Sequence, residues 1–373
     1  MRSTSIVLCS ALLLIGTGRS LAATVITETI PPPPQYTVTD LGSLGWVSAI
    51  GTGINSTGDV SGYVWNEIRV RVRGHRSVRW NGTLGAYNES LGGSGFDSQG
   101  WDINDAGQVA GFSRIPIPGD LDPTDNPNHA VRWTNGIPTD LGTLGGTFSS
   151  AYAINASGQV AGNASTTGDA AYPPVVWTGT TATALGTLGG GGTAYDINDL
   201  GQVAGESTLP FSAILHAVRW TGTTPTDLGI GTAKGINNAG QVVGTLGTHA
   251  TIWTGTTPTD LGTLGGSISE GLDINSFGVA VGMSFTTGDL SNQPFISING
   301  MMYNLNNLLV PGSNFFSLEA VTGINDRGQI VGYGLVGSER HTVRLNPVAI
   351  PEPASMGLIV GTGVLFLLRR RRA

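Results

Sequence analysis

Short apolar runs separated by glycine-rich polar turns recur along this chain, and one phrase marks each recurrence. The phrase is Ile-Asn, two further residues, Gly and a short apolar run, and its copies begin at Ile54, Ile103, Ile154, Ile197, Ile236, Ile274 and Ile324. The repeats show no apolar pattern with the period of 3.6 that an amphipathic helix requires. The pattern therefore predicts short β-strands joined by turns.

The repeat spacing narrows the architecture. Successive Ile-Asn pairs lie 38 to 51 residues apart, a period typical of propellers, solenoids or arrays. One unit divides into expected strands over residues 139–144, 151–155, 159–162 and 175–177, with a turn at Gly145-Gly146 after the first. At the corner from Asn155 to Gly158, Asn supplies side-chain turn bonds and Gly tolerates positive φ. Four short strands per unit predict an all-β fold, a seven-bladed β-propeller with four-stranded blades.

The two ends of the repeat region suggest how such a ring closes. Residues 36–42 match the first strand of a unit, whereas residues 341–345 match the fourth. We expect the N-terminal strand to complete the seventh blade, which would cover exposed strand edges. The predicted propeller domain spans residues 36–346.

The repeat phrase resembles a known family. Its basis is Asp140-Leu141-Gly142-Thr143-Leu144-Gly145-Gly146, the Ile-Asn-x-x-Gly-Gln-Val corner, and His-Ala-x-x-Trp at His129 and His216. These features resemble the HAF-family extracellular repeat over about residues 36–346. Three features depart from the family pattern. The Phe that gives the family its name is replaced by Val131 and Val218. Pro174 and Pro294 precede two of the fourth strands, and the last two units lack the Trp. The resemblance implies a secreted repeat protein without an established catalytic activity.

The N-terminus has the pattern of an export signal. Arg2 precedes an apolar stretch over residues 6–15, and small residues follow at 20–23, so residues 1–22 are expected to be a signal peptide and 23–35 a Pro-rich leader. Cys9, the only cysteine, lies within the signal. The processed chain would hold no thiol, which excludes disulfides, thiolate metal sites and cysteine nucleophiles.

The C-terminal segment, 347–373, combines three features. Pro351, Glu352 and Pro353 precede an apolar stretch over 356–368, and a basic cluster follows at Arg369, Arg370, Arg371 and Arg372. An ordinary C-terminal transmembrane tail is one interpretation. The order of the three parts resembles the PEP-CTERM sorting signal of Gram-negative bacteria, in which the Pro-Glu-Pro triplet is recognised by an exosortase. That resemblance implies export across the inner membrane, transient anchoring in the membrane, and delivery to the cell surface or the biofilm matrix.

Charge changes the expected partners. Without the two ends, the 18 basic and 25 acidic residues fall to 12 and 24, a formal charge near −12. Nucleic acid is therefore not an expected partner, because binding it requires a basic surface. We expect a monomer.

Most side chains that could carry chemistry recur at a fixed position of the repeat. His129, His216, His249 and His341 share one repeat position and His75 is displaced by one, which favours a repeated hydrogen bond over one active site. Asp102, Asp196 and Asp273 precede repeat isoleucines, and turn formation is favoured over calcium binding there. No cofactor is expected, with one alternative: Ca²⁺ in the oxygen-rich loop from Asp120 to Asn128, for which a solvated acidic loop is the favoured interpretation.

Two groups are candidate ligand-binding residues. Arg69, Arg71 and Arg73 would share one face of an extended segment and suit an acidic exopolysaccharide, although pairing with a neighbouring acidic insertion is favoured. Trp101, Tyr152 and Tyr195 stand two positions before repeat isoleucines; they suit sugar stacking, but packing between blades is favoured. The recurring Trp80, Trp133, Trp177, Trp220 and Trp253 are expected in the core.

These features predict an exported, non-catalytic surface or biofilm-matrix protein that binds extracellular polysaccharide or surface proteins through loops on one rim. Two alternatives remain open at this point. One is a polysaccharide hydrolase or lyase on the same scaffold, and the other is a purely structural surface component.

Overall fold

The computed structural model describes residues 32–66, 74–93, 97–116, 126–312 and 317–348. This part of the chain is all-β, with 3-10 helices at η2 (Thr167–Asp169), η3 (Thr287–Asp289) and η4 (Leu305–Leu308). Across these ranges no helix has the length and apolar character to cross a membrane. The predicted signal peptide, the C-terminal sorting segment and Arg69, Arg71 and Arg73 lie outside the described residues.

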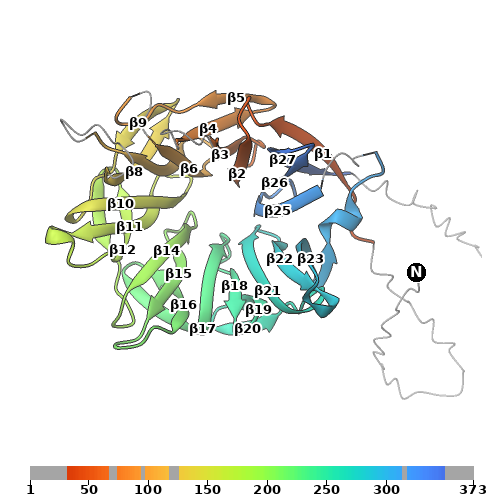
Figure 1. The fold of residues 1–373 in the computed structure, drawn as a ribbon. Helices are drawn as coiled ribbons and strands as arrows, with labels where there is room; N and C mark the ends of the chain where they lie inside the picture. The colour runs from red at the N-terminus through yellow and green to blue at the C-terminus, as the bar shows by residue number, and fades with distance from the viewer. Residues whose placement is uncertain (1–31, 67–73, 94–96, 117–125, 313–316, 349–373) are drawn as a thin grey trace, which may run out of the picture.

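The strands form five sheets around a common centre (Figure 1). Three of them are four-stranded: β6 (Ser98–Ile103), β7 (Val109–Arg114), β8 (Asn128–Thr134) and β9 (Ile137–Asp140); β10 (Gly145–Ile154), β11 (Val160–Thr166), β12 (Pro174–Thr178) and β13 (Thr181–Ala184); β21 (Gly265–Ile274), β22 (Ala280–Thr286), β23 (Asn292–Ile298) and β24 (Met301–Asn304). Within each of these sheets, neighbouring strands are antiparallel hairpin partners.

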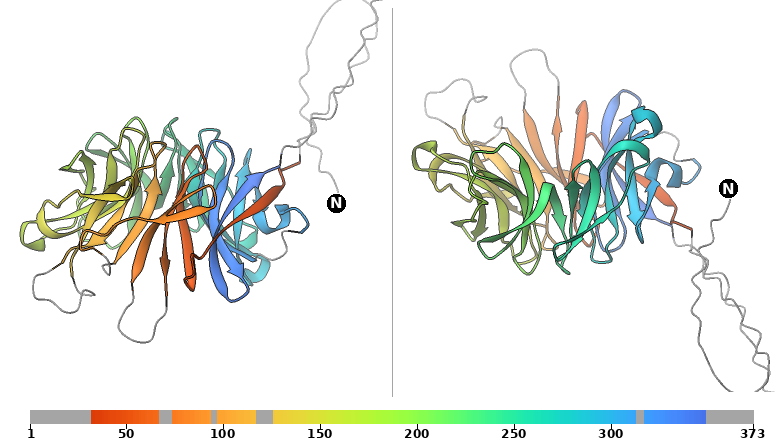
Figure 2. Two further views of the ribbon diagram at one scale, coloured as in Figure 1. Left: turned by 90° about the horizontal axis from the view of Figure 1, so that it is seen from above. Right: turned by 90° about the horizontal axis from the view of Figure 1, so that it is seen from below.

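The other two sheets are larger because they join consecutive repeats. One holds β14 (Gly192–Ile197), β15 (Val203–Thr208), β16 (Leu215–Thr221), the long β17 (Thr224–Ile236), β18 (Val242–Leu246), β19 (His249–Thr254) and β20 (Thr257–Asp260). The other holds β25 (Ser317–Ile324), β26 (Ile330–Val336), β27 (Glu339–Pro347), β2 (Ser48–Ile54), β3 (Val60–Trp65), β4 (His75–Asn81) and β5 (Leu84–Tyr87), with β1 (Tyr36–Gly42) on β27. In Figure 2, which shows the molecule turned by 90°, the strands run between two opposite faces of the molecule.

Each repeat phrase forms the predicted corner. In the third repeat, Asn155 Oδ1 accepts hydrogen bonds from the Gln159 amide at 2.9 Å and from the Ser157 hydroxyl at 2.8 Å. The Gly158 amide donates to the Asn155 carbonyl oxygen at 3.0 Å, and Gly158 has φ of 80°. The side chain of Asn therefore closes the turn, and Gly supplies the left-handed conformation that it needs.

The predicted order of strands within a unit is wrong in one respect. Residues 139–144 do not begin a unit; β9 ends at Asp140 and is the outermost strand of the preceding sheet. The cause is the hairpin at Asn135 and Gly136, whose positive φ values of 53° and 81° fold β9 back onto β8. Gly145-Gly146 are the first residues of β10 instead of a turn.

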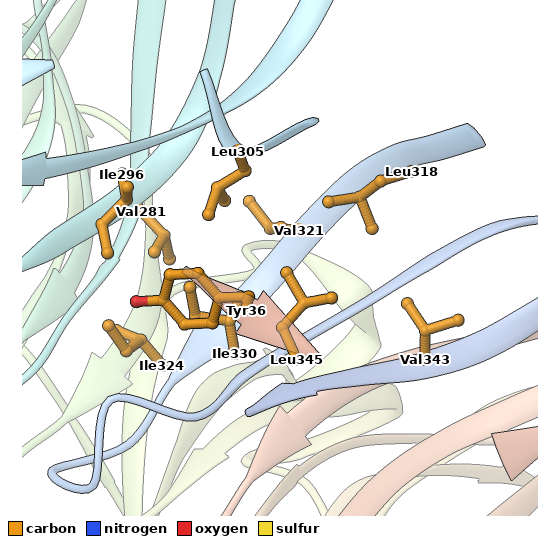
Figure 3. Packing of buried hydrophobic residues seen from close by; sticks show 10 residues of the cluster. All are labelled: Tyr36, Val281, Ile296, Leu305, Leu318, Val321, Ile324, Ile330, Val343 and Leu345. Carbon is orange, nitrogen blue, oxygen red and sulfur yellow. The ribbon is translucent and has the colours of Figure 1, made fainter. Parts of the chain in front are cut away.

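The expected pairing of the two ends is confirmed. β1, red in Figure 1, lies beside the blue β27, with Val38 opposite Leu345 and Thr39 opposite Arg344. Tyr36 is only 1% exposed and packs among Ile296, Leu305, Ile330 and Leu345 (Figure 3). The N-terminal strand therefore covers the edge of β27 and completes a hydrophobic core.

The recurring tryptophans lie in the core, as predicted. All five are at most 1% exposed, and the Trp133 indole donates to the Glu89 carbonyl oxygen at 2.6 Å. A Cβ on Gly111 would lie 1.9 Å from the Gln99 carbonyl oxygen and 2.9 Å from the Trp133 ring, so the glycine that ends the apolar run lets both the neighbouring strand and the indole approach. In the sixth repeat, which lacks Trp, the buried Phe295 ring lies over the equivalent Gly282.

Candidate functional site: the central channel

The asparagines of the seven phrases form one closed cycle of hydrogen bonds. Each Nδ2 donates to the carbonyl oxygen of the next asparagine at 2.8–3.3 Å, in the order Asn55, Asn104, Asn155, Asn198, Asn237, Asn275, Asn325 and again Asn55. We call this the Asn cycle. All seven side chains are buried, and the corners together line a cavity of about 220 Å³. The repeats therefore surround a shared central channel.

Arginines add a second set of contacts between repeats. Arg132 donates to the Gly158 carbonyl oxygen at 3.0 Å, and Arg219 donates to that of Gly240 at 3.1 Å. Arg344, near the end of the last repeat, donates to the corner Gly58 of the first at 2.5 Å. The first and last repeats are thus joined in the same manner as neighbouring ones.

Three carboxylates lie inside the channel, in alternate repeats. Asp102, Asp196 and Asp273 each accept the amide of the isoleucine that follows them, at 2.7–2.8 Å. Each also accepts the amide of the repeat isoleucine on the next inner strand, at 2.7–2.9 Å: Ile154, Ile236 and Ile324 respectively. The expectation that these aspartates form turns is wrong, because asparagine forms the turn and aspartate joins adjacent strands.

Small residues occupy the equivalent position in the other repeats: Gly53, Ala153, Gly235 and Gly323. A Cβ on Gly53 would lie 2.7 Å from Asp102 Oδ1. Each bridging carboxylate therefore needs a neighbour with little or no side chain.

Burial and mutual repulsion shift the acidity of these carboxylates. Desolvation, together with the charge of Asp196, raises the pKa of Asp102 to about 8. Desolvation likewise raises the pKa of Asp273 to about 7 and that of Asp196 to about 6. The backbone amides that donate to the carboxylates oppose the shift without cancelling it.

Aromatic side chains line the channel next to the carboxylates. Trp101, Tyr152 and Tyr195, here called the aromatic arc, come from consecutive inner strands and line a second cavity of about 120 Å³. Ring centroids are 6.4 Å apart between Trp101 and Tyr152 and 6.0 Å apart between Tyr152 and Tyr195. The favoured packing role holds only in part: the rings touch across repeats, but each is partly exposed and faces the cavity.

One cation completes this wall. Lys234, at the equivalent position in the fifth repeat, places Nζ 3.6 Å from the Tyr195 ring centroid. The Tyr195 hydroxyl donates to Glu206 Oε1 at 2.8 Å. Thr52, Leu272 and Thr322 occupy the same position in the remaining repeats.

The histidines make a repeated hydrogen bond, as predicted. His129, His216, His249 and His341 each place Nδ1 2.9–3.0 Å from an aspartate, respectively Asp140, Asp227, Asp260 and Asp40. His75 pairs with Asp97 at 3.0 Å. These pairs involve the outer strands, and no histidine is among the described residues that line the two channel cavities.

The proposed calcium loop from Asp120 to Asn128 lies outside the described residues up to Asp125. Asn128 itself donates from Nδ2 to the Ser149 carbonyl oxygen at 2.9 Å. Within the described ranges, no group of three or more His, Cys, Asp or Glu side chains is placed to hold a metal ion.

Sequence reasoning missed Lys234 and the bridging role of the aspartates as parts of this site. The aspartates stand directly before the repeat isoleucine, and Lys234 stands two positions before it. At both positions the residue type varies between repeats. That variation at a position facing the channel was the available signal.

Comparisons with known proteins give structural similarities at low sequence identity. No protein-family model matches the chain, and no curated protein matches it. The β-propeller domain of the Trilobed protease from Pyrococcus furiosus is 10% identical, with a TM-score of 0.46 over 80% of this chain and 95% of that one. A gluconolactonase from Xanthomonas campestris is 9% identical, with a TM-score of 0.41 over 85% and 95%. The described part of the chain is all-β, and these two solved structures are proteins to which it is similar.

Proposed function

We propose that this chain is an exported, non-catalytic β-propeller that binds extracellular glycans at the cell surface or in the biofilm matrix. The observation that carries the proposal is the aromatic arc, since Trp101, Tyr152 and Tyr195 present partly exposed rings to one cavity. Rings of this kind offer large, rigid faces for the apolar face of a sugar.

The proposed scaffold has seven four-stranded blades. The first to sixth would be β2–β5, β6–β9, β10–β13, β14–β17, β17–β20 and β21–β24, and the seventh would be β25–β27 with β1. Two features support this division: the Asn cycle runs through seven corners, and β1 supplies the fourth strand of the last blade. No single sheet closes on itself; hydrogen bonds and packing between blades would close the ring.

Polar groups beside the arc suit a glycan. The Tyr195 hydroxyl donates to Glu206, and those of Thr52 and Thr322 donate to the carbonyl oxygens of Gly100 and Gly51 at 2.9 and 2.8 Å. Each hydroxyl oxygen can still accept a hydrogen bond from a sugar hydroxyl. A site of a few aromatic faces and hydroxyls would bind weakly, and many copies along a polymer would add avidity.

The channel carboxylates favour binding over hydrolysis. A glycosidase needs one carboxyl group to protonate the leaving oxygen and a second as base or nucleophile. Asp102, Asp196 and Asp273 instead each accept two backbone amides that join neighbouring strands. Their shared structural role argues against a catalytic role for these three carboxylates, so the hydrolase or lyase alternative is not the one we advance.

The destination of the protein rests on the two ends of the sequence. The Pro351-Glu352-Pro353 segment resembles an exosortase signal, and exosortase is the processing partner we propose. An additional contact of Arg69, Arg71 and Arg73 with acidic exopolysaccharide stays a proposal drawn from sequence.

A glycan array tests this function. The purified protein is expected to bind a subset of matrix glycans, and Trp101→Ala combined with Tyr152→Ala is expected to abolish that binding. Tyr87→Ala, a partly exposed tyrosine on the outer strand β5, is the matched control. Absence of glycan binding, or release of reducing ends from purified matrix by the wild-type protein, would contradict the proposal.

A further inference from the structure

The cavity beside the aromatic arc already contains one cation. Lys234 is the only lysine of the chain, and its ammonium lies 3.6 Å from the Tyr195 ring centroid. An ammonium over the face of a tyrosine or tryptophan is attracted by the negative face of the ring. The geometry of the arc therefore suits a positively charged group.

The balance of charge around the cavity points the same way. Asp102, Asp196 and Asp273 line it together with Lys234. The three carboxylates accept hydrogen bonds from backbone amides, and within the described residues none of them forms an ion pair. Near neutral pH the raised pKa values leave Asp102 mostly protonated and Asp273 only partly ionised. A bound cation would lower these pKa values and favour the ionised carboxylates, whereas an anion would raise them, so a second cation is favoured over an anion.

Two rings of the arc have no cation over them in the described structure. Trp101 and Tyr152 both face the cavity, and tryptophan is the strongest partner for a cation among the aromatic side chains. The Trp101 indole N–H is enclosed and has no acceptor among the described residues. A ligand at this place could supply an ammonium for the two ring faces, while the enclosed indole N–H stays out of its reach.

The size of the cavity limits the ligand. A volume of about 120 Å³ is close to the space of about 150 Å³ in which a protein can hold one benzene. It has room for one small ring or one ammonium group, and not for several sugar residues.

We propose that this cavity binds a protonated amine, and that the glycan ligand is one that presents an amino sugar. This inference rests on the proposed function and names its ligand class. In it, the ammonium lies over Trp101 and Tyr152 near the channel aspartates, and the rest of the sugar extends along the channel.

Titration of the purified protein, followed by calorimetry and tryptophan fluorescence, tests the inference. The probes are glucosamine with its amine protonated, N-acetylglucosamine, glucose, glucuronate and tetramethylammonium. Glucosamine is expected to bind at least about tenfold tighter than the two neutral sugars, because only it adds a desolvated cation–π contact. Tetramethylammonium is expected to compete with it.

Variants with opposite expected effects separate binding from folding. Trp101→Leu is expected to weaken glucosamine binding about tenfold, because it removes an aromatic face. Lys234→Met is expected to strengthen it about fivefold, because it keeps a side chain of similar length and removes a like charge. Tyr87→Leu is the control without an expected effect. A merely structural role of Lys234 would not produce the gain.

The outcomes distinguish the two proposals. One outcome is that the protein binds array glycans but binds glucosamine and N-acetylglucosamine with equal affinity, or prefers glucuronate. That outcome would overturn the amine inference and leave the glycan-binding function standing. Binding of tetramethylammonium without binding of any sugar or array glycan would uphold the cation site and overturn the glycan-binding function. Failure of every probe and glycan to bind would overturn both.

Discussion

Asn325 donates a hydrogen bond from Nδ2 to the carbonyl oxygen of Asn55 at 2.8 Å, across 270 positions of sequence. The same side chain accepts the amides of Arg327 and Gln329, both at 3.0 Å, and so also forms the corner of its own repeat. One residue thus shapes a local turn and joins the last repeat to the first. The other six asparagines of the Asn cycle make the corresponding contact with the repeat that follows.

Replacement of this asparagine should weaken the whole fold. Asn325→Ala removes four hydrogen bonds of a buried side chain and is expected to lower the free energy of unfolding by about 3 kcal/mol. Asn238→Ala removes an exposed asparagine that follows the cycle residue Asn237, and should cost about 0.5 kcal/mol. Urea denaturation gives both values; equal losses would argue against a special role for the cycle.

The N-terminal strand should protect the last sheet from association. Removal of residues through Gly42 deletes β1, leaves the edge of β27 unpaired, and takes Tyr36 out of a core cluster. Unpaired edges pair with other chains, so the truncated protein is expected to form oligomers or aggregates in size-exclusion chromatography. A truncated protein that stays monomeric with an unchanged melting temperature would refute this role of β1.

The core tryptophans should dominate stability. Trp177 is fully buried, and Trp177→Ala is expected to lower the free energy of unfolding by about 4 kcal/mol through lost burial and the cavity left behind. Phe277 is 76% exposed, and Phe277→Ala should change it by no more than about 0.5 kcal/mol. Chemical denaturation measures the contrast, and a small loss at Trp177 would mean that its surroundings collapse to fill the space.

The channel aspartates should make the protein less stable as pH rises. Their pKa values are raised to about 8, 6 and 7 from an unfolded value near 3.8, so the folded state binds more protons across that interval. The stability that these three groups contribute is fully present below about pH 4, and it is lost as pH rises through the folded pKa values. We expect the melting temperature to fall between pH 5 and about pH 9. Asp102→Asn should flatten this decline; a wild-type melting temperature that rises over the same range would contradict the assignment.

Much of the fold could be predicted because the repeat is local. Asn and Gly at each corner are needed for the turn itself, and the tryptophans are large enough that burial is their expected state. The prediction failed where two local signals compete. The Asn135-Gly136 hairpin places Asp140 at the end of an outer strand, whereas the glycine-rich residues after Asp140 predict the beginning of the next unit.

The candidate site was harder to predict because it depends on contacts between repeats. Asp102 has the neighbours of a turn residue in sequence, but its second hydrogen-bond partner is Ile154, 52 positions away. Trp101, Tyr152 and Tyr195 were identified, yet no single-repeat pattern shows that their strands converge on one cavity. Lys234 is recognised as part of the site only when the Tyr195 ring beside it is known.

The most direct test of the central claim is an experimental structure of the protein with the glycan fragment that binds best on the array. We predict a sugar against Trp101 and Tyr152 inside the channel, with its hydroxyl groups near Tyr195, Thr52 and Thr322. A fragment bound on the outer rim, with the cavity beside the aromatic arc free of ligand, would contradict the account.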